Sequence, residues 1–430
     1  MKYFSDCHFH VMTMKEPNFA SFLNSFYDSA TGILSANTAT NYILTPQLIK
    51  GTSFLDTLSN TLVAFEQPIG NTLMMMEDDL MGMFQPKANK DHQPLLPFIN
   101  NGKFHIRGME AEKMIMIPLV MDFTKRQSEI DRLYYAYPSA DRLLPYLKAM
   151  IEGIREYYEA RPDGLFEFYP FVGIDPNNHS MEYMEKLLSE YVNTSHIMHA
   201  PHTIPDKPCY GIKIYPPLGF SPWPDSKSAL EKNRYLYSFC EKNRIPIITH
   251  CDDQGFRGVS AEEAWANTDP ARWRTVLENY PDLIVDFAHF GKQYAITSRS
   301  NVQSIAARLR HHPDSPWFYS IISMMKDFDN VYADLSFTGC NPVFYDELRS
   351  FMNEQKDDER EKILSRILFG SDFSVNLLKI ESYTEYYSIF EESPFSDEEI
   401  LKIAEENMLR FIGLEEAAIE AKSRRRLIRK

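Results

Sequence analysis

The sequence predicts an α/β fold, a (β/α)8 TIM barrel with a long helical insertion after the first strand and helices at its C-terminal end. Short runs rich in β-branched and aromatic residues recur along the chain, and amphipathic segments with helical spacing separate them. Apolar runs that alternate with helices in this way are typical of parallel strands buried on both faces. About eight such units follow one another, which matches the (β/α)8 barrel.

The first strand is predicted to end in the segment Ser5–His10, close to the start of the sequence. Because side chains alternate along a strand, His8 and His10 should point to one face and Phe9 to the other. Two imidazoles on a rigid backbone form half of a metal site. An isolated His-x-His pair more often consists of two ordinary histidines, so the interpretation depends on ligands supplied by later strands.

A long stretch, residues 12–112, separates the first strand from the second at Lys113–Met121. It is far longer than an ordinary connection, so we expect a mostly helical insert with a substructure of its own. Its methionine-rich run, Leu73–Met76, is expected to pack a helix rather than to bind a metal. The predicted division of the chain is a barrel over 1–414 and a basic C-terminal helix or tail over 415–430.

The remaining strands and helices follow at regular spacing. The strands are predicted at Phe166–Ile174, Tyr210–Tyr215, Ile245–His250, Leu283–His289, Val331–Ser336 and Ile367–Asp372. The helices are predicted at Ser139–Arg161, Met181–Tyr191, Ser228–Lys242, Arg272–Asn279, Val302–Arg310 and Pro342–Gln355. Near the C-terminus, Ser396–Glu399 has the pattern of a capping box, and Gly413 is a predicted helix C-cap.

Composition narrows the class of protein. The chain has 430 residues, a formal net charge of -15 and a pI of about 5.3. Nucleic-acid binding requires a basic surface, so we expect no nucleic-acid partner. No apolar run is long enough to span a membrane, and the chain starts directly with its first strand, so we expect no signal peptide and no membrane contact. The 5 cysteines are scattered, which fits a reducing cytoplasm.

Several residues with metal-binding or acid–base chemistry fall at predicted strand ends, where TIM barrels place their active sites. They are His8, His10, Lys213, His250, His289 and Asp372. Taken singly, each histidine has an ordinary alternative as a hydrogen-bonded core residue, and the aspartate could cap a loop. Their joint position predicts a metal site. Neutral imidazoles and a carboxylate suit zinc, and also manganese or iron.

The same residues resemble a known family. Four features carry the resemblance: Asp6–His10 with the pattern Asp-x-His-x-His, His250, His289, and Phe369–Asp372. Together they resemble the amidohydrolase superfamily, and in particular its branch of metal-dependent TIM-barrel hydrolases and non-oxidative decarboxylases. The segments Gly211–Pro216 and Glu406–Leu414 are similar to the fourth strand and the closing helix of that branch.

The resemblance implies roles for the candidates. His8, His10 and Asp372 would hold a divalent metal, with His250 as a shared or fourth ligand. Asp372 would accept a proton from metal-activated water and pass it to the leaving group. His289 would be a catalytic acid/base beside the site.

Lys213 leaves the number of ions open. As a carbamate it would bridge two metals, with His250 and His289 on the second ion. As a plain amine it would instead bind an anionic part of the substrate or pair with a carboxylate. We favour one ion, because the branch that the chain resembles is mostly mononuclear.

The strand-end loops offer substrate contacts. Tyr215, Phe220 and Trp223 would form an aromatic wall, although packing in the core explains them equally well. Arg257 could bind a carboxylate through two hydrogen bonds or form a structural ion pair.

The predicted function is a cytoplasmic, metal-dependent hydrolase acting on an amide, ester or lactone bond of a small molecule. The alternatives are a non-oxidative decarboxylase of an aromatic or unsaturated carboxylic acid and a non-catalytic binding protein on the same barrel. Beyond a small-molecule substrate, the partner considered is a second copy of the chain in a homo-oligomer.

Overall fold

The computed structural model describes residues 1–13, 61, 63–84, 95–124, 142–253, 255, 259–293 and 316–428. Among these residues, no helix combines the length and the apolar character needed to cross a membrane.

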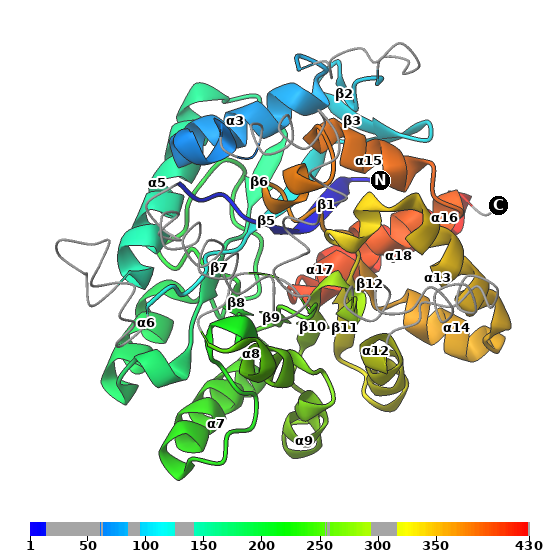
Figure 1. Cartoon of the computed structure of the whole chain (residues 1–430). Coiled ribbons are helices and arrows are strands. Elements are labelled where there is room, and N and C mark those ends of the chain that lie inside the picture. Colours follow the sequence, from blue (N-terminus) through cyan, green and yellow to red (C-terminus); the bar gives the residue numbers. More distant parts are fainter. Residues whose placement is uncertain are drawn as a thin grey trace, which may run out of the picture.

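Two parallel sheets form the centre of the molecule, and helices surround them (Figure 1). The first sheet has the order β1-β5-β6 and consists of β1 (Tyr3–Phe9), β5 (Lys113–Pro118) and β6 (Phe166–Phe168). The second has the order β12-β11-β10-β9-β8-β7. Its strands are β7 (Phe171–Gly173), β8 (Gly211–Ile214), β9 (Ile247–Thr249), β10 (Val285–Phe287), β11 (Val331–Asp334) and β12 (Ile367–Leu368). The predicted α/β class with parallel strands is confirmed.

Backbone hydrogen bonds join the edges of the two sheets. At one seam the Cys7 N–H donates to the Phe369 carbonyl at 2.9 Å, just beyond β12. At the other, the Val120 N–H donates to the Phe171 carbonyl at 3.0 Å, so β7 continues the sheet beside the end of β5. The predicted third strand, Phe166–Ile174, is divided into β6 and β7 because Pro170, between them, has no N–H to donate.

Alternation along the strands separates two cores. Val285 and Phe287 of β10 belong to a large cluster that includes residues of the surrounding helices. Ile284 and Ala288 belong to a smaller cluster, which includes Phe411 of α17 (Asn407–Phe411). Apolar residues therefore flank β10 on both faces, as the hydrophobic run of the sequence predicted, although Asp286 lies on the same face as Ile284 and Ala288.

A β-bulge interrupts the alternation in β1. The β1–β5 register pairs Asp6 with Met116 and Phe9 with Pro118, so the interval from Asp6 to Phe9 on β1 faces a shorter interval on β5. The extra residue lets Cys7 and His8 both leave the outer face, and it returns Phe9 to the outer cluster with Phe4.

The helices follow most of the predicted positions. They include α5 (Leu143–Ala160), α6 (Met181–Tyr191), α7 (Lys227–Lys242), α9 (Arg272–Asn279) and α13 (Pro342–Glu354). The predicted capping box of Ser396 and Glu399 is confirmed at the start of α16 (Asp397–Leu401), and Gly413 has the positive φ of 79° expected of a C-cap. The helix predicted at Val302–Arg310 lies outside the described residues.

The helix packing predicted for Leu73–Met76 is confirmed, because Leu73 and Met76 are buried residues of a helix in the insertion. The structure also contains elements that the sequence did not predict. In the described part of the insertion, α3 (Ile69–Leu80) is followed by an antiparallel sheet of β2 (Ile99–Asn100), β3 (Lys103–Ile106) and β4 (Met109–Ala111). Three further helices are α8 (Ala261–Thr268), α12 (Pro316–Asp327) and α14 (Asp357–Leu364). The strands of the small sheet are too short for a periodic signal in the sequence.

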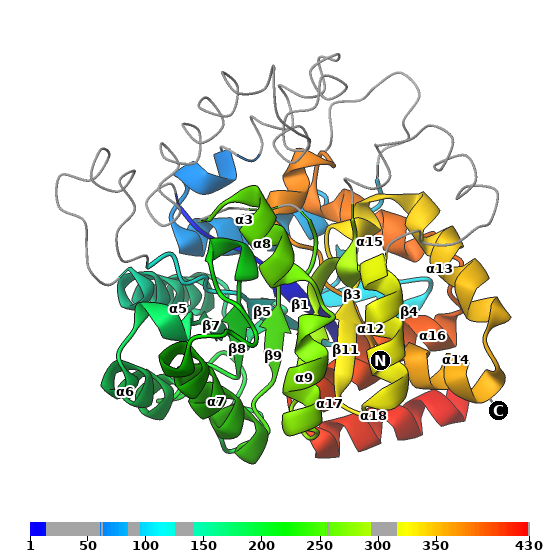
Figure 2. The ribbon, with the colours of Figure 1, turned by 60° about the horizontal axis from the view of Figure 1, so that its bottom comes forward.

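The two ends of the central strands are covered by different elements. Figure 2 shows α3, α8 and α15 (Tyr383–Glu391) at one end, and α17 with α18 (Glu415–Ile428) at the other. The start of β1 lies on the side of the sheets that α17 and α18 cover. The Tyr3 N–H donates there to Glu405, in the π-helical turn Lys402–Glu406 that directly precedes α17. The carboxyl ends of the strands therefore point toward α3 and α8.

A buried carboxyl group fixes α3 to α15. Asp79 Oδ2 accepts a hydrogen bond from the Thr384 N–H at 3.1 Å, and the Thr384 hydroxyl donates to the Asp79 carbonyl at 2.6 Å. Burial raises the pKa of the Asp79 carboxyl from 3.8 to about 6, against the opposing effect of the Thr384 hydrogen bonds.

This pKa shift predicts a pH-dependent stability. A carboxyl whose pKa is raised on folding stabilises the protein fully below its unfolded-state pKa, and that stability is lost as the pH rises through the folded-state pKa. Relative to Asp79→Asn, the free energy of unfolding of the wild type should fall by roughly 3 kcal/mol between about pH 4 and pH 7. Urea titrations across this range measure the difference. Glu66→Gln, which removes an exposed carboxylate just before α3, is the control, and parallel pH profiles for Asp79→Asn and the wild type would contradict the assignment.

Candidate metal centre

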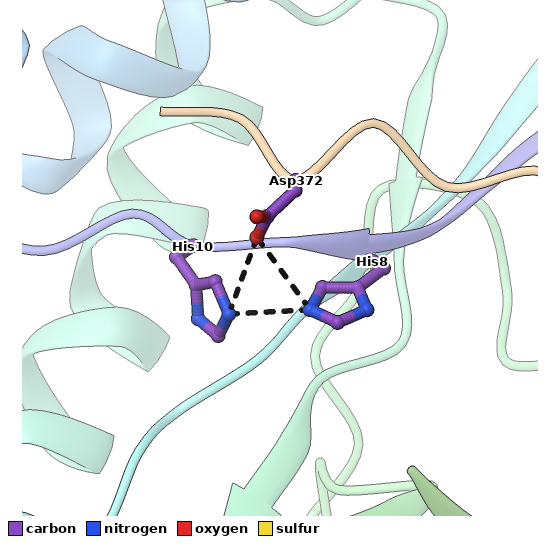
Figure 3. A group of neighbouring side chains, drawn as sticks. All are labelled: His8, His10 and Asp372. Atoms are coloured by element: carbon purple, nitrogen blue, oxygen red, sulfur yellow. Dashed lines mark hydrogen bonds and ion pairs between the residues drawn. The ribbon is translucent and has the colours of Figure 1, made fainter. Parts of the chain in front are cut away.

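Three buried side chains from the two ends of the chain meet at the seam between β1 and β12 (Figure 3). His8 Nε2 and His10 Nε2 are 3.3 Å apart, and Asp372 Oδ1 lies 3.6 Å from each of them. None of the three residues is more than 5% exposed. The structure thus brings His8, His10 and Asp372 together in one triangle of donor atoms.

The hydrogen bonds at the far side of each ring fix where the protons are. His8 Nδ1 lies 2.7 Å from Asp334 Oδ2, and His10 Nδ1 lies 3.1 Å from the Leu119 carbonyl oxygen. Both partners can only accept, so each ring carries its proton on Nδ1 and leaves a lone pair on Nε2. The two Nε2 lone pairs therefore face each other and the Asp372 carboxyl group, and neither ring places a proton between them.

This arrangement fits a divalent cation. Donor atoms at about 2.0–2.2 Å from a tetrahedral zinc ion lie about 3.3–3.6 Å from one another. Burial lowers the pKa of His8 to about 3 and that of His10 well below its usual range, so both imidazoles are neutral and able to act as ligands. The chemistry of the donor set, two neutral imidazoles and one carboxylate, matches zinc and also manganese or iron.

The chain reaches this geometry through an unusual backbone at Asp372. This residue has a positive φ of 61°, and its N–H donates to the His8 carbonyl at 2.7 Å. Gly370 lies two residues before Asp372, and a Cβ at position 370 would lie 2.7 Å from the Cβ of His8. The close approach of the two backbones thus requires glycine at position 370, and it places Asp372 beside the histidines.

Asp6, the first residue of the Asp-x-His-x-His pattern, lies behind this seam. Its Oδ1 accepts from the Ser371 N–H at 2.9 Å, and its Oδ2 accepts from the Tyr383 hydroxyl at 2.8 Å. Burial raises the pKa of Asp6 to about 6, against the effect of these bonds. Asp6 therefore ties β1 to the loop that carries Asp372.

His250 and His289 form a second group. His250 Nδ1 lies 3.2 Å from His289 Nε2, and His250 Nε2 lies 3.0 Å from Asp252 Oδ1. His289 Nδ1 faces the Ser336 carbonyl oxygen at 3.1 Å, so its proton is on Nδ1 and its Nε2 is an acceptor. Burial lowers the pKa of His289 to about 4.

The structure therefore places His250 with Asp252 and His289, and the donor triangle of His8, His10 and Asp372 does not include it. The two groups are neighbours, since the ring centroids of His8 and His289 are 5.0 Å apart.

Lys213 reaches the triangle from β8. Its Nζ lies 3.3 Å from His8 Nε2, and the side chain is fully buried. Burial lowers the pKa of Lys213 to about 8, although Asp334 and Asp372 favour its charged form. Lys213 therefore lies close enough to affect any cation held by His8.

The predicted substrate contacts have different positions. The Tyr215 ring lies 4.4 Å from the His250 ring, so Tyr215 borders the site. Phe220 is buried against Trp273, and Trp223 lies under the guanidinium of Arg234 on α7, 5.2 Å away. Arg257 lies outside the described residues.

Sequence reasoning missed three residues beside these groups: Asp252, Asp334 and Ser336. Asp334 and Ser336 are two positions apart at the carboxyl end of the seventh strand, so they share the inward face with the predicted ligands. That position was the signal that could have identified them.

Fold and site together define an α/β protein with a buried set of candidate metal ligands at the strand ends. Residues 203–414 match a family model described as Amidohydrolase. Over these residues the chain is similar to the amidohydrolase family, and it is an enzyme of the amidohydrolase type. Members of this family are generally metal-dependent. No curated protein matches the chain.

Several solved structures are similar to the chain. A probable 2-pyrone-4,6-dicarboxylic acid hydrolase from Acinetobacter baumannii is 11% identical, with a TM-score of 0.40 over 70% of this chain and 83% of that chain. The 4-oxalomesaconate hydratase from Rhodopseudomonas palustris is 14% identical, with a TM-score of 0.43 over 98% and 99%. The 5-carboxyvanillate decarboxylase from Sphingomonas paucimobilis is 9% identical, with a TM-score of 0.43 over 96% and 99%.

The donor triangle predicts the metal content of variants. His10→Ala removes one of three donors, so its affinity for Zn2+ should fall by more than the about 10–100-fold typical of losing an outer-shell partner. Elemental analysis after dialysis against a weak chelator measures the bound metal. His105→Ala, which changes a histidine on β3, is the matched control and should keep the wild-type content. Equal metal content in His10→Ala and His105→Ala would contradict the assignment.

Proposed function

We propose that the chain is a metal-dependent hydrolase that uses activated water to cleave an amide, ester or lactone bond of a small molecule. The observation that carries this proposal is the triangle of His8, His10 and Asp372, in which two imidazole lone pairs and a carboxyl oxygen converge at 3.3–3.6 Å from one another. Donor atoms arranged in this way are stabilised by a divalent cation, for which zinc is the first candidate.

We further propose that the two parallel sheets are one closed (β/α)8 barrel. The hydrogen bonds from Cys7 to Phe369 and from Val120 to Phe171 support closure, because each connects an edge of one sheet to the other sheet. In such a barrel the active site lies at the carboxyl ends of the strands, where the donor triangle is found.

A bound divalent cation supplies Lewis acidity, which polarises a substrate carbonyl and makes water acidic enough to ionise near neutral pH. Asp372 is the residue of this chain that would accept a proton from the attacking water. Its Oδ1 points into the triangle, and burial raises the pKa of its carboxyl well above the usual range. A carboxylate of raised basicity is suited to accepting a proton and then transferring it to a leaving group.

His289 and His250 provide a second route for protons. Since His289 carries its proton on Nδ1, its Nε2 accepts a proton from the substrate side or from His250 Nδ1, 3.2 Å away. Asp252 holds His250 from the other side at 3.0 Å. The three side chains thus form a connected set of acid/base groups beside the candidate metal ligands.

We propose one ion per chain. A hydrogen bond accounts for the 3.2 Å contact between His250 Nδ1 and His289 Nε2, so a second ion is not needed there. In addition, the Lys213 ammonium, 3.3 Å from His8 Nε2, disfavours a second positive charge.

Lys213→Met tests this number. It should bind one Zn2+ per chain, as the wild type does, and with higher affinity because the neighbouring positive charge is gone. Metal titration followed by elemental analysis measures both quantities. Two ions in the wild type and one in Lys213→Met would show instead that Lys213 bridges two metals as a carbamate.

Isotope labelling separates hydrolysis from its rival. In H2 18O, a hydrolase places the label in the new carboxyl group of its product, whereas a decarboxylase releases CO2 without consuming water. We expect the zinc-loaded chain to give labelled product from a panel of esters, lactones and amides, measured by mass spectrometry. Asp372→Asn should lose this activity by about 100-fold or more, because general acid–base catalysis contributes about 10²–10⁴-fold. CO2 release from aromatic or unsaturated acids, with no labelled product from the panel, would favour the decarboxylase.

A further inference from the structure

Asp334 receives more hydrogen bonds than any role assigned above explains. It is fully buried at the carboxyl end of β11. Its Oδ1 accepts from the His289 N–H at 2.9 Å, from the Ser336 N–H at 3.0 Å and from the Ser336 hydroxyl. Its Oδ2 accepts from His8 Nδ1 at 2.7 Å. One carboxylate therefore contacts a residue of the donor triangle and a residue of the acid/base pair.

The two carboxylate oxygens of Asp334 have different hydrogen-bond partners. Oδ1 faces three donors that have no proton to lose under ordinary conditions: two backbone amides and a hydroxyl. It supports His289 at a positive φ of 60°, a conformation that costs a non-glycine residue free energy. Oδ2 accepts from His8 Nδ1, a ring nitrogen whose protonation depends on the partner it meets.

We infer that Asp334 is a positioning residue that fixes the His8 tautomer, with the proton on Nδ1, and holds the His289 backbone in the conformation that directs its ring toward His250. Only one part of this inference rests on the proposed function, namely the expected effect on cation affinity. The tautomer itself is a property of the metal-free chain.

Asp334→Asn tests the inference because the fixed donors determine how the amide must sit. Three donors face position Oδ1, so the amide oxygen stays there and the amide NH2 faces His8 Nδ1. An NH2 group donates, and His8 must then accept on Nδ1 and carry its proton on Nε2. The lone pair that faces His10 and Asp372 is lost, although the shape of the side chain is nearly unchanged.

The experiment is long-range 1H–15N correlation spectroscopy of the metal-free chain labelled at its histidines, with the His8 signals assigned by their loss in His8→Gln. The wild type should show the His8 proton on Nδ1, and Asp334→Asn should show it on Nε2. The Zn2+ affinity of Asp334→Asn, measured by chelator competition, should fall about 10–100-fold, the usual effect of losing an outer-shell partner of a metal-binding histidine.

Ser336→Ala is the matched control. It removes one of the three donors to Oδ1, and with it the hydroxyl that lies 3.2 Å from His8 Nδ1 and 2.9 Å from His289 Nδ1. The shorter contact of 2.7 Å between Oδ2 and His8 Nδ1 remains, so the His8 tautomer and the Zn2+ affinity should stay close to those of the wild type. A merely structural role for Asp334 predicts that both variants alter stability and that neither changes the tautomer.

The outcomes separate this inference from the proposed function. A His8 proton on Nε2 in the wild type, or on Nδ1 in Asp334→Asn, overturns the inference. If Asp334→Asn fails to fold, the wild-type spectrum still decides, because the inference requires the Nδ1 tautomer there. A wild type with that tautomer but without Zn2+ binding leaves the inference standing and removes the proposed function instead.

Discussion

The site depends first on the extra residue in β1. In a regular strand, Tyr3, Ser5, Cys7 and Phe9 would share the inner face, and both histidines would point outward. The bulge between Asp6 and Phe9 shifts this alternation by one position, so His8 and His10 turn inward while Phe9 joins the outer core. Bulges are common next to active sites because they redirect side chains in this way. Because of the extra residue, the inner face at the end of β1 carries two histidines rather than Phe9.

Burying this many ionisable groups requires that they satisfy one another. Lone pairs on the histidines face a carboxylate, and their protons face acceptors such as Asp334 and the Leu119 carbonyl. Asp286 is an exception, because its carboxyl group lies beside another carboxyl group, that of Asp334. Burial, and then the charge of Asp334, raises the pKa of Asp286 well above its usual range, so it is held as the neutral acid. Polar pairs in a low dielectric are rigid, which suits a site that must hold its ligands in position.

The match to the amidohydrolase family and the geometry of the site support each other through independent observations. The family match covers residues 203–414, which contain His250, His289 and Asp372 but neither His8 nor His10. The structure supplies the missing connection, because it places both N-terminal histidines 3.6 Å from Asp372. The functional assignment therefore does not rest on the family match alone. The histidines of the first strand and the aspartate after the last strand come together only in the folded chain.

The sequence by itself determined the α/β class, the order of the central strands and the residues that form the donor triangle, because hydrophobic periodicity and strand ends are local properties. It did not determine that His250 faces His289 and Asp252, that Asp334 supports His8, or that a small antiparallel sheet follows α3. Those depend on contacts between residues far apart in the chain and on a bulge whose position no local pattern marks. Tertiary structure decided them, because hydrogen-bond partners and ring orientations are fixed only when the strands are side by side.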